Sequence, residues 1–130
     1  MVAQQKIRLL IVDDNKQTQH FLVESLGDHV YEIVQARSGL EALDLLSKIS
    51  VDLIISGEST PGLSGHQLYA LTRKRGNLVP FIMITGVKSF EGDFYYSEGG
   101  KVVPLILERP FPVTRLLEFM EQSLELAKSA

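Results

Sequence analysis

Short apolar runs alternate with segments of helical spacing along this chain, and this alternation constrains the fold more than any other feature. Nearly continuous apolar runs of this length are typical of strands that are covered on both faces. Strands that alternate with helices indicate a parallel sheet between two layers of helices. We therefore expect an α/β fold with a doubly wound, five-stranded parallel sheet. Its strands are predicted at residues 7–12, 31–35, 51–56, 81–84 and 103–107.

Helix signals stand between these runs. In residues 15–26 the apolar side chains Phe21, Leu22 and Leu26 are predicted to share one face. Ser38 with Glu41, and Ser64 with Gln67, have the spacing of capping boxes, in which the two side chains accept the first free backbone N–H groups of a helix. Pro112 suits the first turn of a last helix, because proline has no N–H to leave unpaired there.

Length and composition exclude several classes of protein. The 130 residues fit one domain, residues 1–130, with its core at about 6–126. The net charge of -3 argues against binding of nucleic acid or an anionic membrane by this domain. The apolar runs are shorter than the roughly 20 residues that span a bilayer. The absence of cysteine fits a cytoplasmic protein, which is the location we expect.

Polar or small residues follow four of the predicted strands. They are Asp13 with Asp14, Gly57, Thr85 and Arg109. In an open parallel sheet the functional crevice lies beyond the carboxyl ends of the strands. The fold would therefore gather these residues, which are far apart in the sequence, at one edge of the sheet.

Five motifs in this order resemble the response-regulator receiver domain from about residue 6 to residue 126. They are Leu-Ile-Val-Asp-Asp-Asn at 10–15, Asp-Leu-Ile-Ile-Ser-Gly at 52–57, Pro-Gly-Leu-Ser-Gly at 61–65, Ile-Thr-Gly at 84–86 and Arg-Pro-Phe at 109–111. The resemblance implies a flavodoxin-like fold and a role in a two-component phosphorelay, as a signalling domain and not as an enzyme.

The chain departs from this family at the position that matters most. In receivers the phosphoacceptor aspartate lies four residues before the turn proline, and that position is Gly57 here. The resemblance therefore implies a pseudo-receiver that cannot be phosphorylated and that acts by protein–protein contact. Arg109 replaces the family's lysine, and Ile106 replaces the aromatic switch residue. Thr85 matches the switch threonine, although it can also be interpreted as a local cap.

Asp13 and Asp14 match the family's magnesium ligands, but Gly57 removes the third carboxylate. Two adjacent carboxylates raise each other's pKa unless a cation lies beside them. The always-charged guanidinium of Arg109 can supply this cation and can bind a carboxylate through two N–H groups. We therefore expect an internal contact between Arg109 and an acid. We expect no resident cofactor, and we expect Mg²⁺ to bind weakly at most.

Two alternative functions stay open. The first is a receiver that accepts phosphate on Glu58, Ser56 or Ser59. Glu58 is one residue out of register with the acceptor, and neighbouring strand residues point to opposite faces. The second alternative is a flavodoxin-like domain that binds a small ligand in the same crevice.

The partner surface is expected along residues 87–107 and the last helix. Aromatic residues are enriched in interfaces, and four of them stand close together here: Phe90, Phe94, Tyr95 and Tyr96. Glycines around them weaken the helix expected in this segment, so the alternative is a short, distorted helix in which Phe94 closes the core. The partners that the resemblance implies are a histidine kinase, an output domain or another receiver, and a homodimer is a further option.

Overall fold

The computed structural model describes residues 6–27, 31–58, 60, 62–85, 105–109 and 111–129. The aromatic cluster Phe90, Phe94, Tyr95 and Tyr96 lies outside these residues, as do Ser59 and residues 87–104 of the expected partner surface. In the described part no helix is long and apolar enough to cross a membrane. Its elements are, in chain order, β1 (Ile7–Val12), α1 (Lys16–Leu26), β2 (Tyr31–Ala36), α2 (Gly39–Leu46), β3 (Leu53–Gly57), α3 (Gly65–Lys74), β4 (Phe81–Thr85), β5 (Leu105–Glu108) and α4 (Val113–Ser129).

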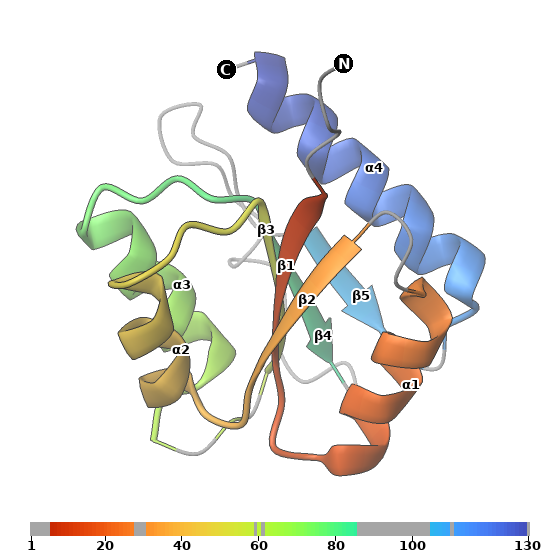
Figure 1. The fold of residues 1–130 in the computed structure, drawn as a ribbon, viewed down its shortest axis with the longest axis horizontal. Coiled ribbons are helices and arrows are strands. Elements are labelled where there is room, and N and C mark those ends of the chain that lie inside the picture. The colour runs from red at the N-terminus through yellow and green to blue at the C-terminus, as the bar shows by residue number, and fades with distance from the viewer. Residues whose placement is uncertain are drawn as a thin grey trace.

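The strands form one sheet in the order β2-β1-β3-β4-β5, and every neighbouring pair is parallel. Helices α1 and α4 lie on one face of the sheet, and α2 and α3 lie on the other (Figure 1). This arrangement confirms the predicted flavodoxin-like α/β fold. It also explains the continuous apolar runs, because both faces of each central strand are covered.

Alternate residues of the strands supply two separate cores. On one face Leu9 and Ile11 of β1 belong to the cluster that holds Leu22 of α1 and Leu116 of α4. On the other face Leu10 of β1 belongs to the cluster that includes buried residues of α2 and α3. The two-residue period of a strand thus places successive side chains of β1 in different cores.

The helix starts follow the predicted capping signals with one difference. Ser64 and Gln67 form the complete capping box of α3. At α2 the Ser38 hydroxyl accepts the N–H of Glu41, as predicted. The Glu41 carboxylate, however, accepts the N–H of Arg37 at 2.6 Å. It therefore bonds one residue before the position that the capping-box pattern predicts.

Two other details differ from the sequence-based prediction. Strand β3 begins two residues later than predicted and includes Gly57 as its last residue. Asp52 precedes the strand, and its carboxylate accepts the N–H of Arg8 at 2.8 Å. Phe21 of α1 is 43% exposed and does not belong to the buried core; its ring meets that of Phe111 edge to face.

Candidate functional site

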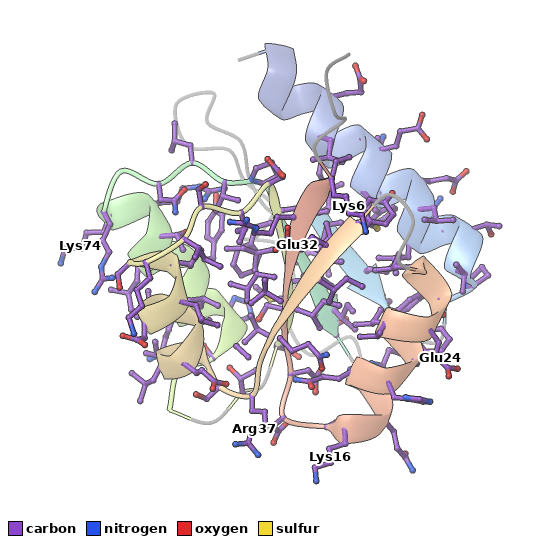
Figure 2. All side chains as sticks on the ribbon, viewed as in Figure 1. Lys6, Lys16, Glu24, Glu32, Arg37 and Lys74 are labelled. Carbon is purple, nitrogen blue, oxygen red and sulfur yellow. The ribbon has the colours of Figure 1, made fainter. Side chains whose placement is uncertain are left out.

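The parallel register brings the ends of the strands together at one edge. Val12 is paired with Ser56, Gly57 with Ile84, and Thr85 with Glu108. The residues that follow these pairs, Asp13 and Arg109 among them, therefore lie beside Gly57 and Thr85. Lys16 and Arg37 point away from the molecule at this same edge (Figure 2).

Asp13 is buried at this edge and is held on three sides. Its Oδ1 accepts the N–H of Asn15 at 2.8 Å. Its backbone N–H donates to the carbonyl of Ala36 at 3.0 Å. The side-chain amide of Gln19 donates to the carbonyls of both Asp13 and Ala36, and thus fastens the turn after β1 to the end of β2. The Asn15 N–H thus holds one oxygen of the Asp13 carboxylate, and the other contacts hold the Asp13 backbone.

The Asp13 carboxylate points at Gly57. A Cβ atom placed on Gly57 would lie 2.9 Å from Asp13 Oδ2 and 3.5 Å from Asp13 Cγ. Real Cβ atoms essentially never approach another heavy atom within 3.0 Å. The place where an acceptor side chain would begin is therefore taken by a carboxylate oxygen from the neighbouring strand.

Arg109 supplies the cation of the site. Its Nη2 lies 3.4 Å from Asp13 Oδ2, so the predicted contact between Arg109 and an acid is confirmed. The contact uses one guanidinium nitrogen, and not two as the guanidinium geometry would allow. The Arg109 backbone N–H donates to the Thr85 carbonyl at 2.9 Å, which anchors the residue at the end of β4.

The pKa of Asp13 is raised above its ordinary value, and burial is the main cause. The Asn15 N–H and the Arg109 guanidinium both lower this pKa, and the charge of Asp14 raises it. Asp14 itself is exposed. The repulsion between the two acids, which the sequence suggests as the main electrostatic problem, is therefore smaller than the cost of burying Asp13.

The other candidate residues lie around this centre. Thr85 is buried, and Ile106 packs against the core on the side of α2 and α3. Of the alternative acceptors, Ser56 is fully buried and donates its hydroxyl to the Gly57 carbonyl at 2.9 Å. The Glu58 carboxylate lies 3.5 Å from His66 on α3, so it is engaged with that helix.

Sequence reasoning missed two residues of the site, Asn15 and Gln19. Asn15 caps α1 and also donates to Asp13. Gln19 is a buried polar residue in line with the buried Leu22 and Leu26 of α1. The sequence signal for Gln19 was its position in the apolar stripe of α1. A polar amide buried there needs hydrogen-bond partners, so it indicates a structural contact.

Among the described residues, this edge of the sheet supplies fewer carboxylates than the three that the family's magnesium site uses. Mg²⁺ prefers octahedral oxygen coordination with one or two carboxylates and several waters. In the described ranges no group of three or more His, Asp or Glu residues gathers where it could hold a metal ion. The buried carboxylate, Asp13, already accepts from Asn15 and contacts Arg109.

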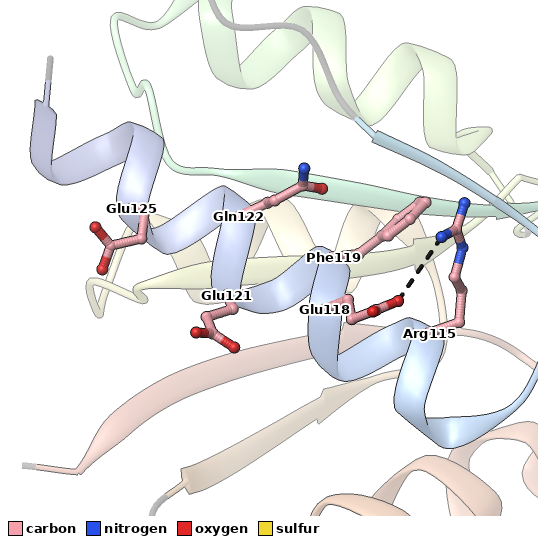
Figure 3. Close-up of a pocket in the computed structure, with 6 residues that line it drawn as sticks. All are labelled: Arg115, Glu118, Phe119, Glu121, Gln122 and Glu125. Atoms are coloured by element: carbon pink, nitrogen blue, oxygen red, sulfur yellow. Dashed lines mark ion pairs between the residues drawn. The ribbon is translucent and has the colours of Figure 1, made fainter.

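Two pockets bear on binding. One, of about 590 Å³, lies along α4 and is lined by Arg115, Glu118, Phe119, Glu121, Gln122 and Glu125. Figure 3 shows Phe119 and Gln122 on one side of the helix and Glu121 and Glu125 on the other. The second pocket, of about 310 Å³, lies beside Arg109 and is lined by Gln17, Thr18, Phe21, Arg109 and Phe111. Only the second pocket adjoins the Asp13–Arg109 contact.

Known proteins are similar to this chain in sequence and in fold. The family model of the response regulator receiver domain matches residues 9–99. The chain is 34% identical over 77 residues to the sensor histidine kinase RcsC of Escherichia coli, a match that covers 59% of this chain and 8% of the kinase. It is 28% identical over 114 residues to the response regulator MprA of Mycobacterium sp. (strain KMS), a match that covers 88% of this chain and 49% of MprA.

A solved structure extends the likeness to nearly the whole chain. The signal receiver domain of an HD domain-containing protein from Pseudomonas fluorescens Pf-5 has a TM-score of 0.80 and 27% identity, over 97% of this chain and 100% of that one. The chain spans about half the length of MprA and under a tenth of RcsC. The receiver motifs lie at the ends of the strands of a five-stranded parallel sheet, and the family model matches most of this chain. This chain therefore belongs to the response regulator receiver domain family of two-component signalling systems.

Proposed function

We propose that this receiver domain does not accept a phosphoryl group and that it signals through protein–protein contact alone. The observation that carries this proposal is the 2.9 Å separation between Asp13 Oδ2 and the position of a Cβ on Gly57. Gly57 supplies no nucleophile, and the neighbouring carboxylate fills the place where one would begin. The Arg109 contact partly offsets the charge of that carboxylate, so no metal ion is needed to hold it there.

The proposed partners are a histidine kinase, an output domain or another receiver. The match to part of a sensor histidine kinase and to about half of a response regulator supports a domain that works beside such proteins. The Asp13–Arg109 contact is internal and does not depend on a phosphodonor. We therefore expect the domain to keep the same conformation and the same affinity for its partners, whether or not other proteins of the pathway are phosphorylated.

Affinity capture tests this expectation. The tagged domain is first incubated with or without acetyl phosphate and magnesium, and the donor is removed. The domain is then mixed with lysate, and the retained proteins are compared by quantitative mass spectrometry. The same proteins should be retained in the same amounts under both conditions, because Gly57 provides nothing for the donor to modify. A phosphorylatable receiver of the same pathway serves as the control for an active donor. Retention by this domain that changes with the donor would contradict the proposal.

Magnesium should hardly stabilise the domain. Ligand stabilisation follows RT ln(1 + [L]/Kd), so a few millimolar magnesium at a site with a Kd of tens of millimolar contributes only about 0.1 kcal/mol. Differential scanning fluorimetry with and without magnesium should therefore give the same melting temperature. A rise of several degrees that is lost in Asp14→Ala would show that the acidic pair holds the metal after all.

A further inference from the structure

The pocket beside Arg109 combines an aromatic wall with a charged rim. It lies between the first turns of α1 and the segment that follows β5. Phe21 and Phe111 meet edge to face, with ring centroids 6.3 Å apart. Phe21 remains 43% exposed, although an aromatic ring of this size is usually covered in a folded domain. The pocket therefore offers an apolar surface that a small molecule could cover.

Arg109 offers this pocket an underused cation. A guanidinium has five N–H donors. Only Nη2 contacts Asp13, at 3.4 Å, and the Arg109 side chain is 40% exposed. Within the described ranges its remaining side-chain N–H groups meet no other carboxylate or carbonyl oxygen at hydrogen-bonding distance. These donors are available for a second anion, and a guanidinium binds a carboxylate most strongly through two parallel N–H groups.

The charges around Arg109 select the kind of anion. Asp13 is in contact with Arg109, and the exposed Asp14 adjoins it in the sequence. Both repel a dianion such as phosphate more strongly than a monoanion. The single cation of Lys16, exposed at the start of α1, offsets only part of this repulsion. A monocarboxylate therefore suits the rim, and an aromatic or other apolar body suits the wall.

We propose that this pocket binds small monocarboxylates that carry an aromatic or other apolar body. Its volume of about 310 Å³ is at the lower end of small-molecule pockets, which hold roughly 300–1,000 Å³. The carboxylate bonds to the free N–H groups of Arg109, and the apolar body covers Phe21 and Phe111. This site adds ligand binding to the proposed protein contacts and does not depend on phosphorylation incompetence.

Phenylacetate is a suitable probe, and its neutral amide, phenylacetamide, is the matched control ligand. Binding is followed from ¹H–¹⁵N chemical shifts of the labelled domain. A ligand of this size should bind with a Kd on the order of 1 mM. Phenylacetate should shift the resonances of Thr18, Phe21 and Arg109, and phenylacetamide should bind about tenfold more weakly, because it lacks the charge. This comparison needs no variant.

Variants then locate the site. Arg109→Gln should weaken phenylacetate binding about tenfold or more while leaving phenylacetamide binding nearly unchanged. Asp13→Asn should tighten phenylacetate binding, because it removes the carboxylate that competes for Arg109. Phe21→Ala should weaken both ligands. Equal binding of the acid and the amide, shifts that centre away from α1 and Arg109, or no saturable shift at 20-fold the expected Kd (roughly 20 mM) would overturn the proposal.

Discussion

In the double variant Gly57→Asp with Arg109→Lys, a large fraction of the protein is expected to accept a phosphoryl group from acetyl phosphate when magnesium is present. The new aspartate supplies both the nucleophile and the missing metal carboxylate. One of its oxygens bonds to phosphorus, and the bond from phosphorus to the acetate oxygen breaks. Lysine is a compact point charge in place of a broad, planar guanidinium, so it leaves room for the metal and the phosphoryl oxygens.

The single variant Gly57→Asp should gain far less phosphoryl group. Its Cβ would lie 2.9 Å from Asp13 Oδ2, so the Asp13 carboxylate must move, while Arg109 still contacts that carboxylate. A third carboxylate beside Asp13 and Asp14 should also lower stability, and magnesium should restore part of that loss. Gly57→Asn with Arg109→Lys is the matched control, because asparagine has nearly the same shape and no carboxylate.

The adduct is measured by intact mass and by its lability to hydroxylamine, which cleaves acyl phosphates. Partner switching should stay weak in the double variant, because Ile106 is not an aromatic reporter of Thr85. If the folded double variant shows neither an adduct nor magnesium-dependent stabilisation, Gly57 does not correspond to the acceptor position, or the edge of the sheet is remodelled beyond these two residues.

Gly65→Ala is expected to destabilise the domain by about 1–3 kcal/mol, the usual cost of overpacking. A Cβ on Gly65 would lie 2.5 Å from the Gly57 carbonyl oxygen and 3.4 Å from Glu58 Cα. Both are backbone atoms at the end of β3, so they cannot turn aside. Helix propensity alone predicts the opposite sign, because alanine favours a helix over glycine by roughly 1 kcal/mol.

Gly57→Ala is the matched control for this measurement. Its Cβ meets the far end of the Asp13 side chain, which can rotate, so its cost should be clearly smaller than that of Gly65→Ala. Urea unfolding of both variants gives the two free energies, provided that the m-value stays unchanged. A Gly65→Ala domain as stable as the original protein would show that α3 does not press on the end of β3 as closely as the structure has it.

The sequence predicted the fold and the neighbourhood of the site for a clear physical reason. Parallel strands end at one edge, so Asp13, Gly57, Thr85 and Arg109 had to be neighbours once the strands were recognised. The contact between Arg109 and an acid was predicted from the need for a cation beside two adjacent carboxylates, Asp13 and Asp14. Both results depend on the spacing of apolar residues and on the positions of charged residues, which are visible in a single sequence.

The details depend on side-chain directions that no such pattern carries. Which of the two acids is buried is determined by the turn that Gln19 fastens to Ala36. The Glu41 carboxylate reaches the N–H of Arg37 instead of that of Ser38, a difference of one residue. Phe21 has the spacing of a core residue, yet its ring lies against Phe111 and stays partly exposed. The burial of Asp13 and the position of the Phe21 ring depend on contacts with segments far away in the sequence. The partner of Glu41 depends on the local geometry of the helix start.

Phosphorylation incompetence is tested most directly by the intact mass of the unmodified protein after incubation with acetyl phosphate and magnesium. We expect an unchanged mass, because Gly57 has no side chain, Ser56 is buried and Glu58 is engaged with His66. A receiver domain with an acceptor aspartate, treated in the same experiment, shows that the donor is active. A stoichiometric adduct with the mass of one phosphoryl group, labile to hydroxylamine, would show that this domain can be phosphorylated and would point to Glu58 as the acceptor.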